Sequence, residues 1–310
     1  SEMQTLMLSA ELTRAMQAPP GKRFWQKLRL DQCLRLYEQT RLIRLLAICY
    51  ELDALVSLAD ATHKHGLVMP VIETGPTAIS ASELVHPLLE HPVGNPLALD
   101  QAGRVLFLTG PNMAGKTTYL RAILTALYFA HLGMGVPAKT FSFVPVQRLL
   151  TSISLSDNLA DGISFFRAEA LRVKAVAQAL AEGSRTIAIM DEPFKGTNVK
   201  DALDASFEVI RELAGKQDSL FVISSHLIEL EESLNAVANI DYWYFEAQEH
   251  CEALAFDYRA RPGVSDQRLG VRVLHEEGVF ELLSADRRLI TGADRENEPP
   301  VQSDAPTALT

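Results

Sequence analysis

The chain has 310 residues, of which 47% are hydrophobic and 22% are charged, and its formal net charge is −10. This composition is typical of folded globular proteins with one large domain or two. The acidic balance argues against a nucleic-acid-binding surface over the whole chain, because phosphate contacts need clustered Lys and Arg.

The N-terminal segment, residues 1–66, is expected to be helical. Residues 1–18 predict a helix that ends at Pro19-Pro20-Gly21, and residues 23–64 predict one long helix or two in tandem, because apolar side chains recur at helical spacing. Basic residues along this segment are Arg14, Lys22, Arg23, Lys27, Arg29, Arg35, Arg41 and Arg44. We favour a solvated helix face with its apolar stripe turned inward, and a local nucleic-acid surface stays open.

Residues 67–288 are expected to form an α/β domain. Residues 67–109 predict short strands and turns, because Pro and Gly interrupt this stretch repeatedly. From residue 105 the pattern alternates strands and helices, which implies a mainly parallel sheet flanked by helices.

The end of the chain changes character. Residues 240–247 and 252–259 predict an antiparallel pair of strands, and residues 268–288 predict a helix. Residues 289–310 have few bulky apolar side chains, so we expect a disordered tail there.

A glycine-bounded loop lies between a predicted strand, residues 105–108, and a predicted helix, residues 119–130. The loop and the start of the helix contain Gly110, Pro111, Asn112, Met113, Ala114, Gly115, Lys116, Thr117 and Thr118. This is the spacing of a phosphate-binding P-loop, or Walker A motif. Gly110 and Gly115 let the backbone approach the phosphates of ATP, Lys116 can reach the β- and γ-phosphates, and the Thr117 hydroxyl can bind Mg²⁺. A chance glycine turn before a helix is the alternative, which the complete pattern disfavours.

Two further strand ends carry polar residues. The strand at residues 186–190 ends in Asp191 and Glu192, a Walker B pattern in which Asp191 would contact the Mg²⁺ shell. The pair resembles that of ABC-like ATPases, which implies that Glu192 is the catalytic base. The strand at residues 219–223 is followed by His226, which could sense the γ-phosphate, although a lone His is more often structural or solvated.

These motifs together resemble the ATPase domain of MutS proteins, the DNA mismatch-repair ATPases, over about residues 50–275. Four blocks occur in the family's order, at residues 109–119, 156–169, 190–197 and 225–230. Pro-Asn-Met inside the first block is nearly diagnostic. The second block looks like the family's signature loop and the helix that follows it.

The resemblance implies an ABC-like P-loop ATPase preceded by a helical lever segment, with ATP and Mg²⁺ as ligands. It also implies a homodimer in which the signature loop of one subunit approaches the nucleotide held by the other. Ser164 would then meet the partner's γ-phosphate. The residues expected to carry catalysis are therefore Glu192, Lys116, His226 and Ser164, with Thr117 and Asp191 on the metal.

The sequence also departs from the family pattern. Ala114 stands where the family usually has Gly, and Pro193-Phe194-Lys195 replaces the usual Ile/Leu-Gly-Arg. The 310 residues contain no counterpart of the mismatch-reading domain or of a complete clamp. We therefore expect a divergent relative or an excised ATPase fragment, in which DNA binding by this chain is weak.

Other sequence features concern the compartment. No apolar run approaches the roughly 18 residues of a transmembrane helix, and we find no secretory pattern of a basic stretch followed by an apolar one. Cys33, Cys49 and Cys251 are widely spaced and odd in number, which fits buried thiols in a reducing compartment better than disulfides or a zinc site. We expect a cytoplasmic protein that has no membrane partner.

The leading functional hypothesis is an ATPase whose cycle drives DNA handling, in mismatch repair or in related repair and recombination. The alternative is a nucleotide-gated interaction module with little turnover, although the retention of both Asp191 and Glu192 argues against it. A transporter or chromosome-structuring ATPase of the wider ABC branch is disfavoured, because the chain has no Leu-Ser-Gly-Gly-Gln-like segment.

Overall fold

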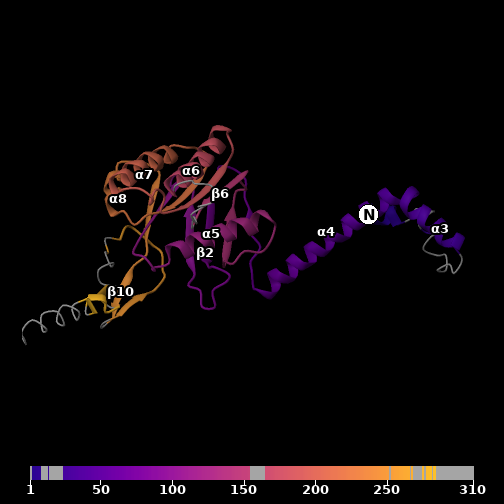
Figure 1. The fold of residues 1–310 in the computed structure, drawn as a ribbon, viewed down its shortest axis with the longest axis horizontal. Helices are drawn as coiled ribbons and strands as arrows, with labels where there is room; N and C mark the ends of the chain where they lie inside the picture. Colours follow the sequence, from indigo (N-terminus) through magenta and orange to yellow (C-terminus); the bar gives the residue numbers. More distant parts are fainter. Residues whose placement is uncertain are drawn as a thin grey trace, which may run out of the picture.

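The structure is a computed structural model that describes residues 2–7, 13, 24–153, 165–250, 253–265, 267, 274–275, 277–280 and 282–283. Ser164 and residues 289–310 lie outside these ranges, so the expected signature-loop serine and the expected tail stay predictions. The described chain has a mixed α/β architecture (Figure 1).

The larger sheet has six strands in the order β12-β9-β4-β8-β7-β6. Its strands are β4 (Val105–Thr109), β6 (Arg148–Ser152), β7 (Thr186–Asp191), β8 (Leu220–Ser224), β9 (Ile240–Tyr244) and β12 (Arg261–Pro262). The pairs β9-β4, β4-β8, β8-β7 and β7-β6 are parallel, and only β12 runs antiparallel to its neighbour. The expected mainly parallel sheet is therefore present, and the carboxyl ends of β4, β7 and β8 meet at one edge.

Both faces of this sheet are buried, which explains why its central strands are apolar without alternation. Leu106 and Leu108 of β4 enter one core cluster, while Val105 and Phe107 enter a second cluster on the opposite face. The helices α6 (Phe165–Ala181), α7 (Val199–Ala214) and α8 (Ile228–Leu234) cover the second face together (Figure 1).

The first core cluster joins the larger sheet to α5 (Lys116–His131) and to a smaller sheet. The smaller sheet has the order β1-β5-β2-β3. Its strands are β1 (Val71–Ile72), β2 (Ile79–Leu84), β3 (Asn95–Leu99) and β5 (Thr140–Phe143). Because α5 is enclosed between the two sheets, its first turn is held firmly at the edge where β4 ends.

The N-terminal part forms an arm that extends away from the two sheets (Figure 1). It consists of α1 (Glu2–Met7), α3 (Phe24–Gln32), a π-helical stretch (Cys33–Tyr37) and α4 (Gln39–Lys64). None of the residues of α4 is buried, so the expectation of an apolar stripe turned inward is wrong for this helix. Its apolar side chains are exposed or only partly covered, since the described chain supplies no core beside it.

Two smaller expectations also need correction. The antiparallel pair consists of β10 (Ala247–His250) and β11 (Ala253–Phe256), whereas residues 240–244 join the larger sheet in parallel with β4. Apolar periodicity does not tell a hairpin strand from a buried parallel one. Among the cysteines, Cys49 is exposed and Cys33 is half-buried, so neither is the buried thiol that was expected, and Cys251 lies outside the described residues.

In the described part of the chain, no helix is both long and apolar enough to cross a membrane.

Candidate functional site: a loop, a helix start and two strand ends

The loop between β4 and α5 requires glycine at both of its ends. Gly110 has φ +131°, and a Cβ there would lie 2.5 Å from the Phe245 carbonyl oxygen. Gly115 has φ +108° and immediately precedes α5. Ala114 is fully buried and is not among the residues with positive φ, so its methyl group is accommodated without backbone strain.

The Lys116 side chain folds back across this loop. Its ammonium donates hydrogen bonds to the carbonyl oxygens of Gly110 (2.7 Å) and Pro111 (3.1 Å), and it lies 3.9 Å from Glu192 Oε1. Burial lowers the pKa of the Lys116 ammonium, although the charges of Glu192 and Asp191 oppose that shift. The cation is thus held inside the loop at the edge of the sheet.

Thr117 and Asp191 come from separate elements and meet directly. The Thr117 hydroxyl donates a hydrogen bond to Asp191 Oδ2 at 2.7 Å, and the Ser224 hydroxyl donates to Asp191 Oδ1 at 2.5 Å. The parallel pairing of β7 with β8 places Asp191 beside Ser224. Ser224 was not predicted as a site residue from the sequence, since its partner depends on which strands are neighbours.

The oxygen atoms of Thr117 and Asp191 suit a hard divalent cation such as Mg²⁺. Within the described ranges, no group of three His, Cys, Asp or Glu side chains is arranged to hold a metal ion. A cation here would need further oxygen ligands from phosphate or water, which is the usual arrangement for Mg²⁺ in nucleotide sites. The two residues therefore fit the predicted metal.

Glu192 directly follows Asp191 and has a left-handed backbone, with φ +49°. Its backbone N–H donates to both the carbonyl oxygen and the hydroxyl of Ser224, each at 3.1 Å. His226 Nδ1 lies 3.7 Å from Glu192 Oε1. The interaction with His226 is the main cause that holds the pKa of Glu192 below its usual value, against the effect of burial, and nearby Lys116 and Lys195 add to it. Glu192 is therefore a carboxylate at neutral pH.

The loop that follows Glu192 is fastened to α6. Phe194 has φ +67° and is 4% exposed, with its ring centroid 5.9 Å from that of Phe166. The Glu169 carboxylate is also buried and accepts a hydrogen bond from the Gly196 N–H at 3.4 Å. Burial raises the pKa of Glu169, although the backbone N–H groups of this loop work in the other direction. The segment that differs from the family pattern, residues 193–195, is thus held by contacts with α6.

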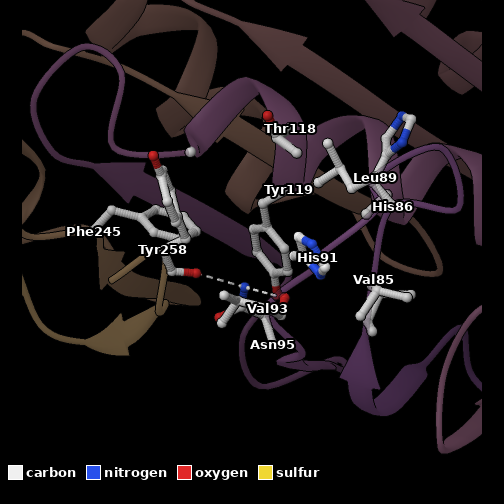
Figure 2. A pocket seen from close by; sticks show the side chains of 13 residues that line it. Val85, His86, Leu89, His91, Val93, Asn95, Thr118, Tyr119, Phe245 and Tyr258 are labelled. Carbon is white, nitrogen blue, oxygen red and sulfur yellow. Dashed lines mark hydrogen bonds between the residues drawn. The ribbon is translucent and has the colours of Figure 1, made fainter. Parts of the chain in front are cut away.

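A pocket of about 350 Å³ adjoins the start of α5. Its walls include Gly115, Thr118 from α5, the rings of Phe245 and Tyr258, and both His86 and His91 (Figure 2). Tyr258 was not among the site residues predicted from the sequence. No local pattern marks that tyrosine, because its relation to Gly115 arises from packing alone.

The structure brings most of the predicted site residues together. Residues of the Gly110–Gly115 loop, Lys116, Thr117, Asp191 and Glu192 lie at one edge of the larger sheet, and His226 stands beside Glu192. The side chain of Met113 points to solvent and is 74% exposed. Ser164 lies outside the described residues, so its expected position near the γ-phosphate stays a prediction.

A protein-family model for MutS domain V matches residues 106–289, which is more than half of the 310 residues. The match begins in β4 and includes the loop, α5, the acid pair and His226. MutS domain V is the ABC-like ATPase domain of its family. The chain therefore belongs to the MutS family, the family of DNA mismatch-repair ATPases.

Proposed function

We propose that this chain is a Mg²⁺-dependent ATPase with the ABC-like P-loop fold, which converts ATP and water to ADP and phosphate. The observation that carries the proposal is the convergence of four side chains from two elements. Lys116 and Thr117 begin α5, while Asp191 ends β7 and Glu192 follows it. The Lys116 ammonium lies 3.9 Å from Glu192 Oε1, and the Thr117 hydroxyl lies 2.7 Å from Asp191 Oδ2. One cation, one hydroxyl and two carboxylates thus surround the mouth of a glycine-bounded loop.

The loop and the start of α5 would bind the triphosphate. Among the described residues, no side chain caps the N-terminus of α5, so its first N–H groups are left for a ligand. Lys116 would exchange its two carbonyl contacts for phosphate oxygens, and Thr117 with Asp191 would hold Mg²⁺. The metal ion supplies neutralisation of the negative charge on the phosphates.

Glu192 would act as the general base. Its carboxylate takes a proton from water, while the water oxygen forms a bond to the γ-phosphorus. The bond between that phosphorus and the bridging oxygen breaks, and ADP leaves with the electron pair. His226, beside Glu192, would contact the γ-phosphate. Positioning and charge stabilisation account for catalysis of this type.

The pocket beside Gly115 and Thr118 would take the base of the nucleotide. Aromatic rings lie on its walls, and such rings stack on the faces of bases. A ligand whose phosphates enter the loop has its nucleoside end beside the first turn of α5. The pocket therefore favours a nucleotide over an inorganic polyphosphate.

Membership of the MutS family suggests how the ATPase is used. The chain would act as a homodimer in which Ser164 approaches the partner's nucleotide, and its cycle would drive DNA handling in mismatch repair or a related repair or recombination pathway.

Glu192→Gln tests the proposal. The amide keeps the size of the side chain but cannot take a proton from water, so ATP–Mg²⁺ binding should persist while turnover falls by roughly 10²-fold or more. Lys116→Ala should instead lose most ATP binding. Binding is measured by titration calorimetry and turnover by phosphate release.

A normal turnover in Glu192→Gln would remove this residue from the role of base. A wild-type turnover as low as that of Glu192→Gln, with ATP still bound, would favour a nucleotide-gated interaction module. Lys139→Ala, an exposed lysine at the start of β5, is the matched control and should leave both measurements unchanged.

A further inference from the structure

Asn95 is a buried amide at the start of β3, and it is only 6% exposed. Its Nδ2 donates hydrogen bonds to the carbonyl oxygens of Tyr258 (2.9 Å) and Val93 (3.3 Å), and its Oδ1 accepts from the Ala260 N–H at 2.7 Å. Figure 2 shows the contact with Tyr258 across the lower part of the pocket. Both ends of the amide are therefore used by main-chain groups, and two of the three belong to a segment 163–165 residues away.

Tyr258 is held in an unusual conformation. Its φ is +56°, which is rare for a residue with a bulky side chain, and the residue is 47% exposed. The ring lies beside Gly115, where an added Cβ would meet Tyr258 Cδ1 at 3.3 Å. A backbone strained in this way persists where the surrounding structure enforces it, so contacts around Tyr258 must hold this conformation.

Asn95 bonds the strained residue directly, at the carbonyl of Tyr258, and again two residues later, at the N–H of Ala260. The turn itself is closed by contacts of its own. Asp257 Oδ1 accepts from the Arg259 N–H at 3.0 Å, and the Asp257 carboxylate pairs with the Arg261 guanidinium. Asn95 therefore does not form the turn; it fastens the finished turn to β3 at the pocket wall.

We infer that Asn95 is a positioning residue, which holds the Tyr258 ring where the base of the nucleotide stacks and so sets the affinity for the nucleoside part of the ligand. This rests on the proposed function, since it assumes a nucleotide in the site. Asn95 is 6% exposed and both ends of its amide already bond to the main chain, so it acts through Tyr258.

The test compares ATP–Mg²⁺ with tripolyphosphate–Mg²⁺, which carries the phosphates without a nucleoside. Dissociation constants are measured by calorimetry for the wild type, Asn95→Asp, Tyr258→Ala and the double variant. Asp keeps the acceptor for the Ala260 N–H but turns a carboxylate toward two carbonyl oxygens. Asn239→Asp serves as the control, because it changes an amide just before β9, at the end of that strand away from the pocket.

Each single variant should weaken ATP binding by about tenfold, which is the usual contribution of one stacked base. The double variant should be no weaker than Tyr258→Ala, because Asn95 acts through that ring. Affinity for tripolyphosphate should stay within about twofold of the wild type throughout, and the control Asn239→Asp should bind ATP normally.

Equal weakening of both ligands by Asn95→Asp, or losses that add in the double variant, would overturn the inference. So would a wild type that binds tripolyphosphate as tightly as ATP. A wild type that binds neither ligand would instead contradict the proposed function. If circular dichroism shows that Asn95→Asp is unfolded, Asn95→Ser, which is too short to bridge to Tyr258 and carries no charge, is put through the same comparison.

Discussion

At the scale of single residues, the candidate site depends on charges that are partly buried and closely paired. Lys116 lies inside its loop, Glu192 stays ionised because of His226, and Asp191 is held by two hydroxyl groups. A second charged pair, Asp257 with Arg261, closes the turn that carries Tyr258. Burial works to raise the pKa of Asp257, but the hydrogen bonds and charges of Arg261 and Arg259 outweigh it and lower the pKa.

This shift gives a pH-dependent prediction for stability. A carboxyl whose pKa is lowered by folding stabilises the protein above its unfolded pKa, and that contribution is lost as pH falls through the folded pKa. Asp257→Asn should therefore lower the free energy of unfolding by about 1 kcal/mol near neutral pH, as a well-formed, partly exposed pair does. The difference from wild type should persist down to the ordinary value of 3.8 and disappear below the lowered pKa.

Urea denaturation at about pH 7 and about pH 3 measures both quantities. Asp204→Asn, an exposed carboxylate on α7, is the control and should show little change at either pH. A deficit in Asp257→Asn that is equally large in acid would mean that the pair with Arg261 is not its cause.

At the scale of elements, the loop after β7 is supported by α6. The family usually has Gly at position 194, and here Phe194 keeps a left-handed backbone with φ +67°. The cost of that conformation is of order 1–3 kcal/mol for a residue other than glycine. Burial of the ring against Phe166 and the contact of Glu169 with Gly196 offset the strain.

At position 194, the usual order of stability, in which an Ala variant is more stable than a Gly variant, should therefore be reversed. Phe194→Ala removes a buried ring while the strain remains, and we expect a loss of about 3 kcal/mol. Phe194→Gly loses the same ring but adopts positive φ freely, so it should be more stable than the Ala variant by about 1 kcal/mol. Urea denaturation of both variants measures the difference.

Phe141 provides the comparison, because it is 2% exposed in β5 and is not among the residues with positive φ. There the Gly variant should be less stable than the Ala variant, in the usual order. The same order at position 194 would show that the left-handed backbone does not persist without the ring.

At the scale of the whole molecule, the arm is the segment whose positive charges could contact DNA. In the arm, Arg35 is paired with Asp31 at 2.7 Å and Arg41 with Glu38 at 3.3 Å, so part of its positive charge is already balanced. The net charge of −10 also opposes contact with the phosphates of DNA. Both observations support weak DNA binding by this chain.

DNA binding should therefore be weak and steeply dependent on salt, because only phosphate contacts by the arm would contribute. A gel-shift titration at about 50 mM and about 200 mM salt should show a large loss of affinity between the two. Replacing Lys27 and Arg35 with Gln should weaken binding further. Tight binding to mismatched duplex that is insensitive to salt would contradict this view.

The dimer predicts complementation between two inactive proteins. Lys116→Ala lacks the phosphate-binding lysine, and Ser164→Arg blocks the signature loop that would face the partner's nucleotide. A mixed dimer contains one site with an intact Lys116 and an intact Ser164. The ATPase activity of the mixture should exceed the sum of the two separate activities.

The controls for this experiment are folded variants and demonstrated subunit exchange, measured by circular dichroism and by energy transfer between labelled chains. If subunits exchange and activity stays at the sum, Ser164 does not act across the dimer. A wild type that is fully active as a monomer by light scattering would also exclude the composite site.

The sequence by itself determined those features that depend on short stretches of chain. One apolar strand is followed by the glycine-bounded loop and its lysine, and another is followed by the acid pair. Parallel strands bring their carboxyl ends to a common edge. The meeting of Thr117 with Asp191 was predictable for that reason. The parallel character of the sheet also follows from the alternation of strands and helices.

Only the tertiary structure decided the contacts that depend on strand order and on packing between distant segments. Ser224 reaches Asp191 because β8 pairs with β7, and Asn95 reaches Tyr258 across 163 residues of sequence. The left-handed Phe194 is tolerated because α6 brings Phe166 and Glu169 against it. Local propensity carries no information about such partners, since their positions are set by the register and packing of elements that are far apart in the chain.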